Sequence, residues 1–261
     1  MTEVTTGRVG TSEVERRASE RTVDVHSCVL VHGGWHGGWH WDEVAARLRQ
    51  MGGQVFAPTL RGLADRADEA TPETNLMDHV ADVVAVIDEE KLSDVVLVGH
   101  SYGGVVISGA AHQRPDRIAQ LVYLDAFVPH DGQSVGDILG SEFRDAALAA
   151  AAAAGTPSMI PPLFSVEDIL GWTGDRASAF AARMCPHPVG TLDDPITLDG
   201  HVDAERSYVY CSARPLGLVE RFAAAAREAD DWRYFELPSP HDAVHAMPAA
   251  VAGIIAFHMG L

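Results

Sequence analysis

Short runs of apolar residues alternate with longer amphipathic segments from about residue 27 to the end of the chain. β-Branched residues are frequent in these runs, and most runs are apolar along their whole length, which is typical of strands buried on both faces. Alternation of such strands with helices predicts an α/β fold, with a mostly parallel sheet flanked by helices. The predicted strands cover residues 27–31, 54–57, 95–98, 121–124, 207–211 and 232–236.

The clearest helical pattern covers residues 75–90. Its apolar positions recur at the spacing of a single helix face, and its charged residues fall mainly on other faces. This predicts a helix with one buried stripe, made of Leu76, Val80, Val83, Val84 and Ile87.

The alternation breaks between residues 130 and 206, where an alanine run is followed by several prolines. Helix-forming and helix-breaking residues are mixed here with scattered aromatic and methionine side chains, which suits a helical cap over a cleft. The plainer alternative is that these side chains only pack the insertion onto the sheet. We therefore predict one domain over residues 25–261 with a cap insertion at about 130–206, preceded by a flexible polar arm over residues 1–24.

The composition of the chain argues against several classes of function. The 37 acidic and 19 basic side chains give a formal net charge of −18, which repels nucleic-acid phosphates and anionic lipid. No apolar run reaches the roughly 18 residues that a membrane span needs, so we expect no membrane segment. The three cysteines form neither a disulfide framework nor a zinc motif, which favours the cytoplasm.

The motif that carries chemistry is Gly-His-Ser-Tyr-Gly at residues 99–103, directly after a predicted strand and before an apolar helical run. In a G-x-S-x-G elbow the chain reverses sharply, and the glycines leave room for the bend. Ser101 would then stand exposed at the carboxyl edge of the sheet as a nucleophile. The backbone N–H of Tyr102 would point to the place where an oxyanion forms.

A serine nucleophile needs a base, and His241 is the best placed of the 13 histidines because it follows the last predicted strand. With Asp242 and His245 it forms H-D-A-V-H, which superficially resembles the zinc motif H-E-x-x-H. Two prolines precede it and an aspartate replaces the glutamate. We therefore predict no metal there.

The second oxyanion donor is expected in the glycine-rich loop after the first strand, and our candidate is the N–H of Gly34. Three histidines in this loop, His32, His36 and His40, are spaced by four residues. The interleaved glycines argue against the helix that would align them, so hydrogen bonding within the loop is the preferred interpretation.

The triad carboxylate is predicted to be Asp125, at the carboxyl end of the fourth predicted strand. Precedent for this fold often places the acid after the fifth of these strands. No acid occurs there before Glu220, which stays as an alternative. The chain order Ser, Asp, His agrees with the order in this class of elbow.

These residues together resemble the α/β-hydrolase superfamily over about nine-tenths of the chain. The segments at residues 31–39, 59–63, 99–104 and 240–242 are similar to the branch of plant methylesterases and hydroxynitrile lyases with their bacterial relatives. The resemblance implies a serine hydrolase with a Ser-His-Asp triad and no cofactor.

Residues that differ from those of that branch argue against some of its reactions. Hydroxynitrile lyases carry a threonine and a lysine where this chain has Gly33 and Asp242, which disfavours cyanohydrin cleavage. The acid position resembles that of some haloalkane dehalogenases, but their nucleophile is an aspartate, unlike Ser101. Cofactor-free dioxygenases of this fold stay an alternative.

The preferred hypothesis is an enzyme that hydrolyses a small, aromatic or lactone-type carboxylic ester through an acyl-enzyme. The alternatives are a ligand-binding protein with little or no turnover, a cofactor-free dioxygenase and a hydroxynitrile lyase. We expect a small-molecule ester as the partner, without nucleic acid or membrane. Four apolar side chains are predicted to contact it: Trp35, Phe127, Met159 and Trp172.

Overall fold

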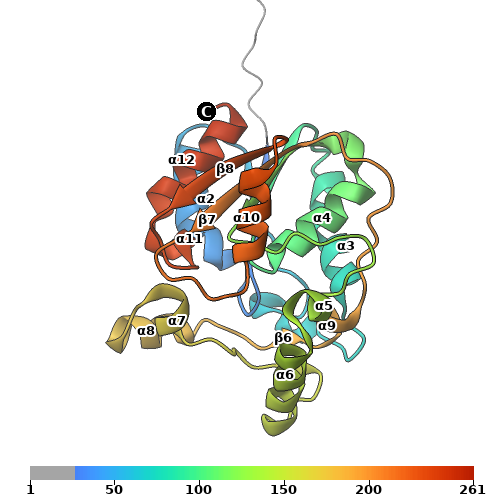
Figure 1. Ribbon diagram of the computed structural model, residues 1–261, viewed down its shortest axis with the longest axis vertical. Helices are drawn as coiled ribbons and strands as arrows, with labels where there is room; N and C mark the ends of the chain where they lie inside the picture. Colours follow the sequence, from blue (N-terminus) through green and yellow to red (C-terminus); the bar gives the residue numbers. More distant parts are fainter. Residues whose placement is uncertain (1–26) are drawn as a thin grey trace, which may run out of the picture.

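The computed structural model describes residues 27–261, so the predicted arm at residues 1–24 lies outside the described residues. Its main sheet has six strands in the order β2-β1-β3-β4-β7-β8, and every neighbouring pair is parallel. Figure 1 shows this sheet with helices on both faces. The strands are β1 (Cys28–Val31), β2 (Val55–Phe56), β3 (Val95–His100), β4 (Ile118–Leu124), β7 (Glu205–Cys211) and β8 (Trp232–Leu237).

Each predicted strand overlaps an observed one, so the predicted α/β fold with a parallel sheet is confirmed. The alternation of side chains along β1 shows why its run is continuously apolar. Val29 and Val31 pack into the core on one face of the sheet, while Cys28 and Leu30 pack into the core on the other. Both faces are covered, and neither can carry polar side chains at these positions.

Two layers of helices cover the sheet. One face packs against α3 (Leu76–Glu89), α4 (Gly103–Gln113) and α10 (Glu220–Glu228). The opposite face packs against α2 (Asp42–Gln50), α11 (Ala243–Ala246) and α12 (Pro248–Met259). Short 3-10 turns lie in the connections, at η1 (Gly38–Trp41), η2 (Ala64–Glu69) and η3 (Pro115–Arg117).

Helix α3 lies where the predicted helix over residues 75–90 was expected. Asn75 caps it, because the Asn75 side chain accepts hydrogen bonds from the backbone N–H groups of Met77 and Asp78. The Asp78 carboxylate in turn accepts from the Asn75 N–H, which completes a capping box. All five residues of the predicted stripe are buried.

The segment between β4 and β7 forms a group of short elements, gathered below the sheet in Figure 1. A two-stranded antiparallel ladder, β5 (Met159–Ile160) with β6 (His187–Pro188), ties this segment together. Its helices are α5 (Val135–Leu139), α6 (Ser141–Ala153), α7 (Val166–Leu170), α8 (Gly174–Ala181) and α9 (Gly190–Asp193). None of the helices among the described residues has the length and apolar character needed to cross a bilayer.

Candidate active site

Ser101 occupies the bend between β3 and α4. Its φ of 53° lies in the left-handed region, where a non-glycine residue is strained. The bend needs glycine at both flanks, because a Cβ on Gly99 would lie 2.5 Å from the Gly103 carbonyl oxygen and one on Gly103 2.6 Å from that of Val31. The Ser101 N–H donates to the Leu124 carbonyl oxygen at 3.2 Å, so the bend is fixed to the end of β4.

Asp125 directly follows β4 and also has a positive φ, 44°. Its Oδ2 lies 2.6 Å from Nδ1 of His241, and both side chains are buried. Its Oδ1 accepts a hydrogen bond from the backbone N–H of Cys211 at 3.0 Å. Both carboxylate oxygens are therefore engaged, and the carboxylate cannot rotate away from His241 without losing a buried hydrogen bond.

The loop after β8 brings His241 to this position from the far end of the chain. Its backbone is held on two sides: Nε2 of His100 lies 3.1 Å from the His241 carbonyl oxygen, and the next N–H, of Asp242, donates to Ile169 at 3.0 Å. With Nδ1 facing Asp125, the His241 Nε2 is left for a partner in the cavity, which Ser101 and His241 both line.

The alternative acid, Glu220, has a different role. Its two carboxylate oxygens accept hydrogen bonds from the backbone N–H groups of Gly217 and Val219, at 2.8 and 3.0 Å. It therefore holds the turn that precedes α10. Ser101 and His241 both line one cavity and Asp125 contacts His241, whereas Glu220 is bonded to the turn before α10 instead.

The contacts of His32 define the direction of the Gly34 N–H in the glycine-rich loop. His32 Nε2 accepts from the Leu60 N–H, so its Nδ1 carries the proton that is donated to the Gly33 carbonyl oxygen at 2.8 Å. In a trans peptide the N–H points opposite the carbonyl, so the Gly34 N–H points away from His32. Gly34 and Tyr102 both line the cavity beside Ser101.

The cavity is mostly apolar and holds about 770 Å³ of empty space, part of it open to solvent. Side chains from the segment between β4 and β7 also line it, among them Phe143, Ile160 and Phe164. Of the four predicted contact residues, Trp35 and Phe127 line it, and the Trp35 ring N–H donates to the Ile160 carbonyl oxygen at 3.1 Å.

Met159 and Trp172 do not line this cavity, and their predicted placement needs correction. Met159 precedes Ile160 in β5, and successive side chains of a strand point to opposite sides, so Ile160 takes the inward position. Trp172 packs beside Phe180, with the Arg176 guanidinium 3.2 Å from its ring centroid.

Several histidines of the cavity wall were not predicted as site residues. His36, His100 and His187 all line the cavity. Burial lowers the pKa of each of them well below the usual histidine value, so these three rings stay uncharged at neutral pH. In the sequence, His100 is marked by its place before the serine in GHSYG and His36 by its spacing from His32 and His40, whereas nothing marks His187.

Asp242 is a buried carboxylate next to His241 in the chain. Burial raises its pKa, but the nearby imidazoles of His40 and His245 outweigh burial and hold the pKa well below its usual range. The Asp242 carboxylate also caps α11, because it accepts from the His245 N–H at 3.1 Å. It is therefore an anion inside the cavity wall.

The buried histidines predict how stability depends on pH. Burial lowers the pKa of His32 to about 3 and that of His79 to about 4. Both rings use one nitrogen as an acceptor, from the Leu60 N–H and from the Tyr102 hydroxyl, and protonation removes that acceptor. An unfolded histidine titrates near 6.5, so the unfolded chain binds more protons below that pH and stability falls with the pH.

We expect the free energy of unfolding to fall by about 2 kcal/mol for each of the two histidines between pH 7.5 and pH 5. Urea unfolding at a series of pH values measures this. His79→Gln removes one titrating group and is expected to flatten part of the slope. A stability that is constant or rises toward pH 5 would contradict the assignment of neutral buried rings.

Comparison with known proteins agrees with this geometry. The alpha/beta hydrolase family model matches residues 28–254. The carbendazim hydrolyzing esterase of Nocardioides sp. (strain SG-4G) is 34% identical over 248 residues, 86% of this chain and 96% of that protein. Methylesterase 10 of Arabidopsis thaliana is 35% identical over 114 residues, 41% of this chain and 39% of that protein.

Among solved structures, an extracellular α/β-hydrolase from a Paenibacillus species, described as a structural and functional homologue of tobacco salicylic acid binding protein 2, superimposes with a TM-score of 0.77. It is 28% identical and covers 89% of this chain and 98% of its own. The chain belongs to the alpha/beta hydrolase family. The predicted resemblance to methylesterases and bacterial esterases, and the prediction of an enzyme of the esterase type, are confirmed.

Proposed function

We propose that the protein hydrolyses a carboxylic ester with Ser101 as nucleophile, His241 as general base and Asp125 as the orienting carboxylate. The observation that carries this is the buried contact of 2.6 Å between Asp125 Oδ2 and His241 Nδ1, at the edge of the cavity that Ser101 also lines. Ser101, Asp125 and His241 are distant in sequence. They follow β3, β4 and β8, whose carboxyl ends lie at one edge of the parallel sheet.

The chemistry follows from this arrangement. His241 Nε2 accepts the Ser101 proton as the oxygen attacks the ester carbonyl, and Asp125 stabilises the imidazolium that forms. The Gly34 and Tyr102 N–H groups stabilise the tetrahedral oxyanion, each worth roughly 3 to 4 kcal/mol. The imidazolium then protonates the leaving alcohol, and a water activated by His241 releases the acid. These steps need no cofactor.

The substrate we propose is a small ester with an aromatic or aliphatic group. Apolar side chains such as Trp35, Phe127 and Phe164 dominate the cavity lining, so burial of an apolar group supplies the binding energy. The relative from Nocardioides, by its name, hydrolyses carbendazim, and the relatives from Arabidopsis are methylesterases. Both names agree with a small ester.

Covalent labelling tests the proposal most directly. A fluorophosphonate is expected to label wild-type protein at Ser101 alone, and His241→Ala is expected to remove rapid labelling because the hydroxyl then lacks its base. Ser178→Ala, at an exposed serine of α8, is the matched control and should label like wild type. A protein that binds ligand without turnover would resist labelling although its cavity is intact.

A panel of p-nitrophenyl esters of increasing chain length, with aryl methyl esters and lactones, then defines the substrate class. We expect turnover of small and aryl esters and a loss of kcat/KM for chains too long for the cavity. Oxygen uptake with a hydroxylated heteroaromatic, or release of cyanide from a cyanohydrin, in the absence of ester turnover would replace the hydrolase proposal by a dioxygenase or a lyase.

We propose the cytoplasm as the location. Cys28, Cys185 and Cys211 are free thiols. Cys28 and Cys211 are buried in the core between the sheet and helices α2, α11 and α12. Burial raises the pKa of the Cys211 thiol well above its usual value, so it stays protonated and packs as a small apolar group.

A further inference from the structure

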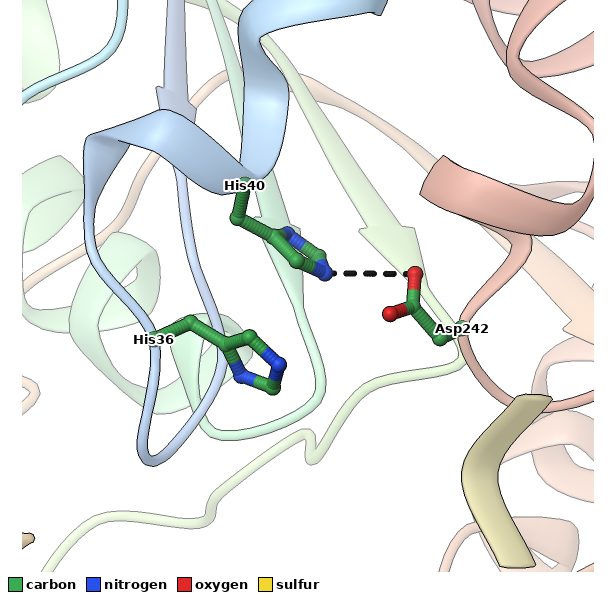
Figure 2. A group of neighbouring side chains, drawn as sticks. All are labelled: His36, His40 and Asp242. Atoms are coloured by element: carbon green, nitrogen blue, oxygen red, sulfur yellow. Dashed lines mark ion pairs between the residues drawn. The ribbon is translucent and has the colours of Figure 1, made fainter. Parts of the chain in front are cut away.

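Three buried side chains face one another beside the cavity: His36, His40 and Asp242 (Figure 2). The first two come from the glycine-rich loop and η1, and the third from the loop that carries His241. Each can offer one ligand atom, and these three atoms lie within 4.8 Å of one another. The contact between His40 Nε2 and Asp242 Oδ1 is 3.2 Å.

Most ligand atoms of this group have no hydrogen-bond partner among residues 27–261, and the exception is Asp242 Oδ1, which accepts from the His245 N–H at 3.1 Å. His36 Nδ1 faces the Gly34 carbonyl oxygen at 2.6 Å, which leaves the buried Nε2 without a partner. Asp242 Oδ2 is buried without a partner as well. His40 Nε2 lies 3.2 Å from Asp242 Oδ1 but forms no aligned hydrogen bond with it, so His40 Nε2 is also without a partner. Buried polar atoms in this state are rare in proteins.

We propose that His36, His40 and Asp242 form a binding site for one divalent transition-metal ion of the zinc class. Two imidazoles and one carboxylate are a ligand set that zinc accepts, with bonds of about 2.0 to 2.2 Å. Two ligands on such a tetrahedral ion lie about 3.3 Å apart, and the contact of 3.2 Å between His40 and Asp242 already matches this. Because the three ligand atoms lie within 4.8 Å of one another, His36 has to approach by at most about 1.5 Å.

The surroundings of the site suit an ion. The Gly34 carbonyl fixes the His36 tautomer that presents Nε2 as a lone pair, the arrangement usual for metal-binding histidines. With both imidazoles neutral the group carries the single negative charge of Asp242, which a cation offsets. Since Asp242 follows His241 and His36 is bonded to Gly34, the ion joins the loop of the general base to the oxyanion loop.

This geometry differs from the two metal motifs considered in the sequence. His32 is excluded from the group because its ring nitrogens bond to Gly33 and Leu60. His245 contacts Asp242, with Nδ1 3.4 Å from Oδ1, but it is not one of the three. Two histidines of the first motif meet the aspartate of the second, at a place that neither spacing defines.

The test is equilibrium binding of Zn²⁺, and of Co²⁺ as a spectroscopic probe, to the full chain after treatment with a chelator. We expect one Zn²⁺ per chain at a micromolar or lower Kd, a rise in Tm of several degrees, and the intense visible bands of tetrahedral Co²⁺. His40→Gln and Asp242→Asn are each expected to weaken binding by at least 100-fold.

Two further variants keep the test decisive. His36→Gln removes a ligand without touching the cap of α11, so its loss of binding supports the site even if Asp242→Asn is unstable. His201→Gln, at an exposed histidine, is the control for adventitious binding and should bind like wild type. Absence of saturable binding to wild type, or equal binding to wild type and His40→Gln, would overturn the proposal.

Discussion

Alanine in place of Ser101 is expected to lower kcat for the best ester by on the order of 10⁶, to the background rate. The Ser101 hydroxyl is the group that the proposal uses to form the acyl-enzyme, and its backbone is fixed at a strained φ of 53°. The cavity itself should survive, because the Ser101 N–H and carbonyl, bonded to Leu124 and Phe127, are kept in the variant. KM or the Kd of a product acid should therefore change little.

The measurement is initial velocity over a range of ester concentrations, with Ser178→Ala as the matched control. Residual activity of Ser101→Ala above about one per cent of wild type would contradict the acyl-enzyme mechanism. Retained oxygen uptake in the same variant would instead point to a dioxygenase, because that chemistry does not need an acylated serine. Loss of product binding together with activity would indicate a collapsed cavity, and near-ultraviolet circular dichroism distinguishes that outcome.

The sheet and the bend at Ser101 were predictable because they follow from local chemistry. A strand buried on both faces has to be continuously apolar, so β1 and β3 are visible as runs. The bend needs glycine where backbones approach to about van der Waals contact, at Gly99 and Gly103, and this fixes the pentapeptide. The position of Asp125 followed from strand order, since β4 lies beside β3.

The cavity lining was less predictable because the cap has little periodicity. Its strands β5 and β6 have two residues each, so no alternation tells which of Met159 and Ile160 faces inward. The Trp172 ring was expected in the cleft from composition alone, whereas its contacts with Phe180 and Arg176 hold it in a separate small core. Which side chain faces a cleft depends on contacts between residues that are far apart in the sequence, so a local sequence pattern does not predict it.

The meeting of His36, His40 and Asp242 shows the same limit for polar residues. The spacing of His36 and His40 indicated nothing, because the intervening glycines exclude an α-helix. The chain after His36 instead forms the short 3-10 turn η1, which contains His40. The ring centroids of His36 and His40 lie 4.5 Å apart. Asp242 joins them across about 200 residues of sequence, through the order of strands in the sheet.

Asparagine in place of Asp125 is expected to lower kcat by about 10⁴, and the reason lies in the hydrogen bond to Cys211. The Cys211 N–H donates to Oδ1, so the amide oxygen of the asparagine has to occupy that position. The amide NH₂ then faces His241 Nδ1 and donates to it, which moves the imidazole proton to Nε2. An imidazole with a proton on Nε2 cannot accept the proton of Ser101.

Glu220→Gln is the matched control, since it removes the other carboxylate considered for the triad. It should keep kcat within about two-fold of wild type and cost on the order of 1 kcal/mol of stability, because Glu220 only bonds the turn that precedes α10. Measuring kcat against pH for both variants separates the two carboxylates: the deficit of Asp125→Asn should shrink at high pH, where hydroxide replaces the missing base. Full activity in Asp125→Asn together with a large loss in Glu220→Gln would reverse the assignment of the acid.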